Sequence, residues 1–235
     1  EATVEGCRGN RTVTLNGGMD ARRGTISANV TNASGSTITA YSTDNIVTFS
    51  GTVTNQTGGT IQLEAALGSS STEVNFTGTL NNAGSVILTA SGGGGGGTTL
   101  DATGGTINNT GASAVNFYTS SATNTSFGGV ITNTGGALSV YKSGTGTLIL
   151  TSAQTYTGST NVLGGTLTLR DYGALTQTSA INIKYATLTL DNQGLANNTS
   201  RVPTTAAINL SGGAIILNAR QSIDTQTLGA VTLVQ

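Results

Sequence analysis

The feature that most constrains this chain is a strand-and-corner unit that recurs every roughly 20 to 30 residues, a period typical of repeat proteins. In the N-terminal half each unit contains an aliphatic residue, a polar residue and then Asn. The copies are Val30-Thr31-Asn32, Val53-Thr54-Asn55, Leu80-Asn81-Asn82, Ile107-Asn108-Asn109 and Ile131-Thr132-Asn133, in steps of 23, 27, 27 and 24 residues. Such a unit buries its apolar face only by stacking on its neighbours, which predicts a solenoid.

A second strand follows most of these units after a Gly-containing turn, as at Gly58–Leu63 and Gly84–Leu88. Each unit therefore holds at least two strands joined by tight corners. Stacking would give every strand hydrogen-bonded partners above and below, as in a parallel β-solenoid. With strands spaced about 4.8 Å apart, roughly ten rungs would make a rod about 45–50 Å long.

The C-terminal half repeats a different phrase, in which the strands are Thr147–Leu150, Thr166–Leu169, Thr187–Leu190, Ala214–Leu217 and Ala230–Leu233. Alternation with a period of two directs their second and fourth residues to the interior. We expect five rungs to form one aliphatic ladder, which would end at Val231 and Leu233. The residues after these strands would share one edge, where Arg170 and Asp191 would form an exposed ion pair between adjacent rungs.

Composition favours an all-β chain that carries few charges. Only 8% of the residues are charged and the net charge is −1, so no attraction to nucleic acid or to anionic lipid is expected. Regularly spaced aliphatic residues argue against disorder. No run approaches the roughly 18 apolar residues of a membrane-spanning helix, and direct membrane insertion is not expected.

The corner residues have a local explanation. Asn tolerates left-handed backbone angles and bonds its own turn, and stacked amides can hydrogen-bond in a ladder along a rod. The corner residues of this kind are Asn32, Asn55, Asn82, Asn109 and Asn133. The six glycines Gly92–Gly97 are expected to form a flexible insert.

One segment, SGTGTLILTSAQTYTGSTNVLGGTLTL at Ser143–Leu169, resembles the autotransporter-associated β-strand repeat of Gram-negative passenger domains. Its centre, Gln154–Gly158, has Gln where the family commonly has Asn. The resemblance implies a right-handed parallel β-helix, export across the outer membrane, and a role at the cell surface as an adhesive or structural stalk. It brings no catalytic residues. The membrane barrel that ends an autotransporter is not seen before Gln235, so it is cleaved off, lies beyond this chain, or never existed.

Catalytic chemistry finds little support in the residue types. The chain has no His, which excludes a Ser-His-Asp or Cys-His site and leaves a Ser-Lys pair with Lys142 or Lys184 formally open. A β-helix enzyme that degrades polysaccharides would need acidic residues from separate rungs, namely Asp171, Asp191 or Asp224. Scattered acids predict neither a metal site nor a cofactor, and we expect no enzyme.

Both ends of the solenoid are predicted to be uncovered strands, which invite pairing with another chain. We therefore expect end-to-end self-association. The candidate assembly residues are Val13 and Leu15 at one end and Val231 and Leu233 at the other, with Cys7 in an extended segment that would dock on the neighbour. The whole chain, 1–235, is expected to be one domain with an extended segment at 1–11, Asn-cornered rungs at 12–140 and autotransporter-repeat-like rungs at 141–235.

Three functions follow from this sequence. The first is a structural filament subunit, the second a passenger fragment of an adhesin that contacts a host surface or a glycan, and the third a polysaccharide-degrading β-helix enzyme. The chain begins at Glu1, as expected for a mature product whose signal peptide has been removed. An extracellular or outer cell-surface location is predicted.

Overall fold

The computed structural model describes residues 2–3, 12–15, 17, 19–21, 24–42, 46–66, 72–76, 78–91, 98–101, 106–109, 114–119, 124–220 and 224–235. These residues form 28 strands and no helix, so the described part of the chain has no helix that crosses a membrane. Cys7 and the predicted insert Gly92–Gly97 lie outside the described residues.

The strands form three faces, one of which is a sheet of eleven described strands, here called the first sheet. Its strands are β1 (Ala2–Thr3), β3 (Met19–Ala21), β6 (Thr37–Ser42), β9 (Thr60–Ala66), β12 (Ser85–Ser91), β15 (Ala114–Thr119), β18 (Ser139–Ser143), β21 (Thr160–Val162), β24 (Ala180–Lys184), β26 (Ala207–Ser211) and β28 (Val231–Leu233).

The second sheet contains β4 (Gly24–Ile26), β7 (Ile46–Phe49), β10 (Thr72–Phe76), β13 (Thr98–Asp101), β16 (Asn124–Phe127), β19 (Thr147–Leu150), β22 (Thr166–Arg170), β25 (Thr187–Asp191) and β27 (Ala214–Asn218). The third sheet contains β2 (Thr12–Leu15), β5 (Asn29–Asn32), β8 (Val53–Asn55), β11 (Thr79–Asn82), β14 (Thr106–Asn109) and β17 (Val130–Asn133). Two short strands, β20 (Ala153–Gln154) and β23 (Ala174–Leu175), pair with each other.

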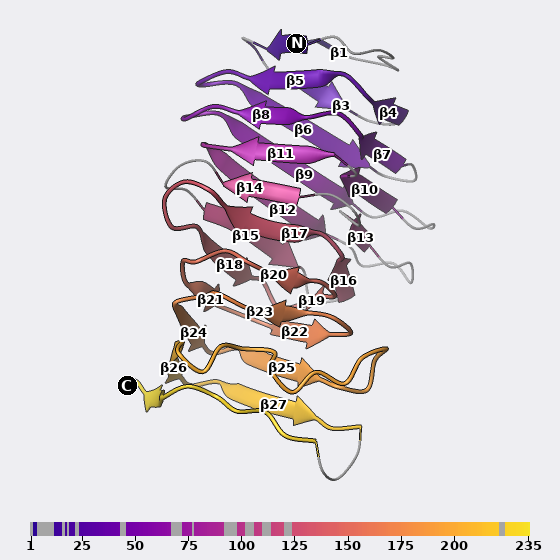
Figure 1. Cartoon of the computed structure of the whole chain (residues 1–235). Coiled ribbons are helices and arrows are strands. Elements are labelled where there is room, and N and C mark those ends of the chain that lie inside the picture. Colours follow the sequence, from indigo (N-terminus) through magenta and orange to yellow (C-terminus); the bar gives the residue numbers. More distant parts are fainter. Residues whose placement is uncertain are drawn as a thin grey trace.

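Neighbouring strands are parallel throughout the described pairs, for example β9 with β12 and β22 with β25. The chain therefore advances one rung at a time along the rod from the N-terminus to the C-terminus (Figure 1), and the predicted parallel β-solenoid is confirmed. A full turn contributes one strand to each of the three faces. The sequence predicted at least two strands in each turn. The first sheet has eleven described strands, so the count of rungs differs slightly from the expected ten.

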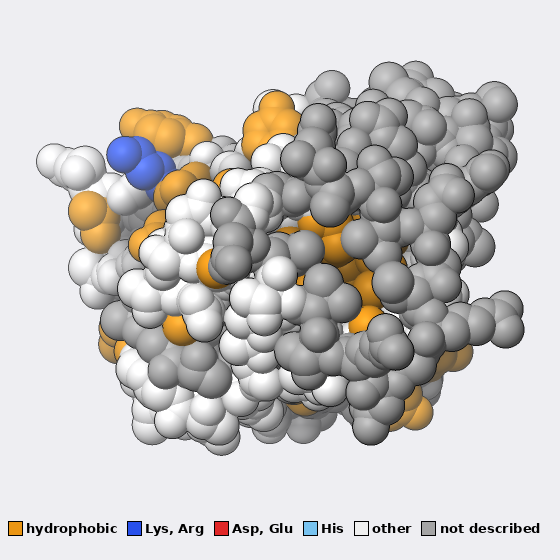
Figure 2. Space-filling view, turned by 90° about the horizontal axis from the view of Figure 1, so that it is seen from above, with side chains coloured by type: hydrophobic (Ala, Val, Ile, Leu, Met, Phe, Trp, Pro, Cys, Tyr) orange, Lys and Arg blue, Asp and Glu red, His pale blue; other side chains and the backbone are white. Residues whose placement is uncertain are grey.

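A column of inward side chains runs along the first sheet, one from each strand after β1, and we call it the inner column. Parallel pairing puts its members in direct register. They are Met19, Ile38, Ile61, Val86, Val115, Val140, Thr160, Ile181, Ile208 and Val231. All except Val231 are buried, because alternation turns every second side chain inward. Seen from the N-terminal end, hydrophobic side chains lie at the centre of the rod (Figure 2).

The predicted aliphatic ladder of the C-terminal half is confirmed for four rungs and wrong for the fifth. Leu148, Leu167, Leu188 and Ile215 follow one another in the second sheet. Val231, however, pairs with Ile208 in the first sheet. The step from Ala214 to Ala230 spans only 16 residues, less than the full turns of this half of the chain, so the chain reaches the next face and stops short of a complete turn.

The predicted amide ladder exists inside the third sheet. Asn32 Nδ2 donates to Asn55 Oδ1, and Asn55 Nδ2 donates to Asn82 Oδ1, both at 2.8 Å. All three side chains are buried. The side chain of Asn109 lies outside the described residues, and Asn133 bonds Thr157.

A second amide ladder, which the sequence repeat did not predict, joins β21, β24 and β26 of the first sheet. Asn182 Nδ2 donates to Asn161 Oδ1, and Asn209 Nδ2 donates to Asn182 Oδ1, each at 2.8 Å. The same residues are register partners in the sheet. Side-chain hydrogen bonds thus run parallel to the rod axis on two faces.

Candidate assembly site at the C-terminal end

The solenoid ends on two edge strands, β27 and β28. In the part of the chain that the structure describes, β27 pairs only with β25, and β28 pairs only with β26. The outward edges of both strands therefore present backbone N–H and C=O groups to which a further strand can bond.

The side chains of this end are more exposed than their register partners one rung earlier. Val231 is 48% exposed, whereas Ile208, its partner in the inner column, is fully buried. Leu233 is 78% exposed, although it follows the partly buried Leu210 in register. Leu217 is 37% exposed above a buried Leu190.

We call Leu217, Val231 and Leu233 the apolar end face. Fully burying an aliphatic side chain of this size contributes about 1.5–3 kcal/mol. Scaled by the exposed fractions of the three side chains, a rung that covers the apolar end face would contribute roughly 2 to 5 kcal/mol. The end of the rod is therefore a surface that a further rung would stabilise.

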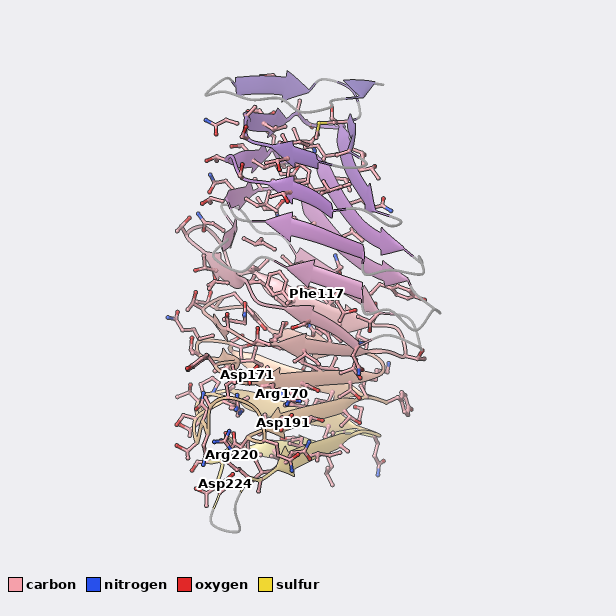
Figure 3. The ribbon with its side chains drawn as sticks, turned by 90° about the vertical axis from the view of Figure 1, so that its right-hand side faces the viewer. Phe117, Arg170, Asp171, Asp191, Arg220 and Asp224 are labelled. Carbon is pink, nitrogen blue, oxygen red and sulfur yellow. The ribbon has the colours of Figure 1, made fainter. Side chains whose placement is uncertain are left out.

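Charged side chains gather near this end on one side of the rod (Figure 3). The predicted pair is present, with Arg170 Nη1 3.4 Å from Asp191 Oδ2. It differs from the expected exposed pair, because the Asp191 side chain is only 8% exposed against 44% for Arg170. Asp191 Oδ1 also accepts a hydrogen bond from the Gln193 amide at 2.9 Å, so this carboxylate holds the turn after β25.

The other two candidate acids also hold corners. Asp171 Oδ1 accepts from the backbone amide of Leu195 at 2.6 Å. Asp224 accepts from Asn197 Nδ2 at 2.7 Å and from the Arg220 amide at 2.6 Å. Among the described residues no three His, Cys, Asp or Glu side chains lie close enough together to hold a metal ion.

Arg201, which sequence reasoning did not single out, is the central residue of the long corner 192–206. Its side chain is fully buried. Its guanidinium donates to the carbonyls of Asp171, Gly173, Asp191 and Ala196 and to Asn192 Oδ1, at 2.6–3.2 Å. Burial lowers the pKa of Arg201, while the nearby Asp191 and Asp171 raise it. One cation thus ties the corner after β22 to the corner after β25, near the C-terminal end of the rod.

The two lysines of the open Ser-Lys alternative lie in different settings. Lys142 is buried, and its Nζ donates to the carbonyls of Ser143, Gly144 and Gly164 at 2.9–3.1 Å. Burial lowers the pKa of Lys142 to about 8, so the ammonium form still prevails at neutral pH. Lys184 is exposed. The three carbonyl bonds of Lys142 join two adjacent corners.

The candidate residues at the other end are described only through their backbone. Val13 and Leu15 lie in β2, where they pair with Val30 and Asn32 of β5. β2 is the N-terminal edge strand of the third sheet, as β1 and β4 are of the first and second sheets. The structure therefore puts the two predicted sets at opposite ends of the rod, and Cys7 lies outside the described residues.

The central residues of the family-like segment face inward and bond the neighbouring rungs. Gln154 is buried, accepts from the Ile131 amide at 2.8 Å and donates to the Gly129 carbonyl at 2.9 Å. The Tyr156 hydroxyl lies 2.6 Å from Thr160 Oγ1, and burial raises the pKa of Tyr156 while that hydrogen bond opposes the rise. Gln154 thus links consecutive rungs inside the core, and Tyr156 bonds within its own turn.

Comparison with known proteins finds one family in this region. The family model described as Passenger-associated-transport-repeat matches residues 140–169. No curated protein and no solved structure matches the chain. The matched repeat and the parallel β-solenoid fit the β-helix of an autotransporter passenger, in agreement with the resemblance noted from Gln154–Gly158.

Proposed function

We propose that this chain is a rod segment of an autotransporter-type passenger, with a structural and non-enzymatic role outside the cell or on its outer surface. The observation that carries the proposal is the inner column, which runs buried from Met19 to Ile208 through the matched repeat at 140–169. A continuous core of this kind makes a stiff rod, which suits a stalk that holds other parts of a surface protein away from the membrane.

The polar groups of the rod support the same function. The three acids that a polysaccharide-degrading enzyme would need, Asp171, Asp191 and Asp224, each accept hydrogen bonds from neighbouring turns. Lys142 is bonded to three backbone carbonyls. These residues hold corners, and we do not propose an enzymatic role for them.

Surface display tests the passenger role. The chain is placed between a signal peptide and a membrane-translocating β-barrel in a Gram-negative host, and display is measured by antibody labelling of intact cells. We expect efficient display of the natural chain and loss of display for Leu188→Asp, because Leu188 is fully buried and pairs with Leu167 of the matched repeat. Leu195→Asp is the matched control, since Leu195 is exposed. Equal display of both variants would contradict a role that depends on the folded rod.

A second candidate function, end-to-end assembly, is favoured by the apolar end face. Here β28 of one copy would pair with β1 of the next, because these strands are the two ends of the first sheet. Val231 and Leu233 would then be covered by the next copy's first rung, to which Val13 and Leu15 belong. Repetition of this head-to-tail contact produces an open filament.

Negative-stain electron microscopy and size-exclusion chromatography at several concentrations test the assembly. Filaments with an axial repeat near one rod length are expected for the natural chain, and short rods for Val231→Lys combined with Leu233→Lys. Leu163→Lys, at an exposed corner away from the end, is the control and should still assemble. Isolated rods of the natural chain at every concentration would exclude the filament and leave the passenger role standing.

A further inference from the structure

The corner between β24 and β25 carries an exposed tyrosine where the adjoining rungs carry glycine. The pairs Ile183↔Leu210 and Lys184↔Ser211 put Tyr185 level with Gly212 on the following rung. On the preceding rung the pair Val162↔Ile183 puts Tyr185 level with Gly164. The aromatic ring therefore lies between two corners that carry glycine at the same position.

Tyr185 adopts a backbone conformation that suits glycine better. Its φ is 49°, and Gly212 at the same corner has φ 63°. Glycine enters this left-handed region without steric cost, whereas a bulky side chain there is unusual. The ring is 75% exposed, so core burial does not compensate for the strain. Strain of this kind persists mainly where function needs the residue.

The ring is held in place by the glycine beside it. A β-carbon on Gly212 would lie 2.8 and 2.9 Å from Cε1 and Cδ1 of Tyr185, so the ring occupies the space that a side chain would fill. The Tyr185 amide also donates to the Ser211 carbonyl at 2.9 Å. One side of the ring rests on backbone, and the remainder is presented to solvent in a fixed position.

A groove of about 460 Å³ opens beside this ring. Its lining consists of Tyr185 and small residues from three rungs, including Gly165, Thr166, Thr187, Gly212 and Gly213. The lining contains no carboxylate, ammonium or guanidinium group. The site thus combines an aromatic platform with hydroxyl and backbone groups and without charge.

This chemistry selects a neutral carbohydrate. A sugar has one face of C–H groups that packs on an aromatic ring, and hydroxyls that exchange hydrogen bonds with Thr side chains and backbone groups. A charged ligand would lack a counter-charge here, and a purely apolar ligand would need an enclosed pocket. We propose that the Tyr185 groove binds a neutral oligosaccharide, a binding activity that goes beyond the structural role proposed above.

The test is titration of the full chain, followed by NMR, with a panel of neutral α- and β-linked hexose and N-acetylhexosamine oligosaccharides. An affinity near 1 mM, about −4 kcal/mol, is sufficient for detection. Binding of at least one panel member by the natural chain is expected. Tyr185→Gly should weaken that binding at least about tenfold, the factor that corresponds to 1.4 kcal/mol.

Stability separates lost binding from lost folding. Tyr185→Gly should keep or raise the urea midpoint, because glycine relieves the left-handed strain. Tyr172→Ala is the matched control, since Tyr172 is an exposed tyrosine outside the groove, and it should bind like the natural chain. Failure of every oligosaccharide to bind at about 10 mM, or unchanged binding by Tyr185→Gly, would overturn the proposal. Neither result bears on the rod itself, which surface display tests separately.

Discussion

Replacing Asn55 tests whether the direction of hydrogen bonding in the buried amide ladder matters. Asn55 accepts from Asn32 Nδ2 and donates to Asn82 Oδ1, both at 2.8 Å, and to the Gly59 carbonyl at 3.2 Å. Asn55→Ala removes these three hydrogen bonds. Each is worth about 0.5–1.5 kcal/mol net, so the free energy of unfolding should fall by about 2–4 kcal/mol.

Asn55→Asp has nearly the same shape but replaces the donating amide with an oxygen. That oxygen would face two acceptors, Asn82 Oδ1 and the Gly59 carbonyl, in a position that is 1% exposed. A buried carboxylate that keeps the donor Asn32 Nδ2 but meets two acceptors costs more than a deleted side chain. At pH 7 we expect Asn55→Asp to destabilise the chain by about 2 kcal/mol more than Asn55→Ala.

The pH dependence supplies the decisive comparison. Burial against acceptors raises the folded-state pKa of the new carboxyl above its unfolded value. The folded state then binds the proton more tightly, so stability is present at low pH and is lost as the pH rises through the folded pKa. At pH 4 the protonated group can donate to Asn82, and the deficit of Asn55→Asp should shrink toward that of Asn55→Ala.

Urea denaturation followed by far-UV circular dichroism, at pH 4 and pH 7, measures these differences against the natural chain at the same pH. Asn81→Ala is the control, because Asn81 accepts only a 3.3 Å bond from Asn108 on a partly buried face, and it should cost less than about 1 kcal/mol. Equal, pH-independent losses for Asn55→Ala and Asn55→Asp would refute the reasoning.

Three further substitutions follow from close contacts and buried cations. A β-carbon on Gly158 would lie 2.1 Å from the Leu138 carbonyl oxygen, so Gly158→Ala should lower the free energy of unfolding by about 2 kcal/mol or more. Urea denaturation measures this loss. Gly17→Ala is the control, because a β-carbon on Gly17 would have no atom within 4 Å. Burial lowers the pKa of Lys142 to about 8, so between pH 7.5 and 9.5 the folded state loses this proton before the unfolded state does. The free energy of unfolding of the natural chain should therefore rise over that range. Lys142→Met should abolish the rise. Arg201→Lys should lower the free energy of unfolding by on the order of 3 kcal/mol, since an ammonium replaces no more than three of five hydrogen bonds. The loss of hydrogen-exchange protection should be concentrated in the corner 192–206.

The sequence repeat predicted the fold because equivalent positions in successive repeats are the residues that pair between successive strands. The Asn-corner steps from Val30 to Ile131 are the pairings found in the third sheet, since a residue that needs one place in a corner recurs once per turn. The third strand of each turn was harder to see. In β16 one inward position is Thr125, which is buried and is matched in the next rung by Leu148, so the apolar alternation is interrupted there.

The end of the rod and its charged residues were predicted less well. Val231 and Leu233 repeat the phrase of the second sheet, and only the length of the preceding corner assigns them to the first sheet. Arg201 belongs to an irregular corner and has no periodic position, so its burial follows from three-dimensional packing alone. The strained Tyr185 was not predicted either, because its positive φ follows from its position level with Gly212, which only the strand register shows.

The corner that contains Arg201 shows that the length of a turn can change without a change in the register of the strands. Leu167 and Leu188 pair across a turn of 21 residues, and Leu188 and Ile215 pair across one of 27, yet the strands on both sides keep the same alignment. Added residues are accommodated outside the sheets, where one buried guanidinium bonds carbonyls of this corner, of β25 and of the preceding corner. Related chains can therefore gain or lose loops at this corner, or carry a grafted peptide there, while the spacing of the rungs stays constant.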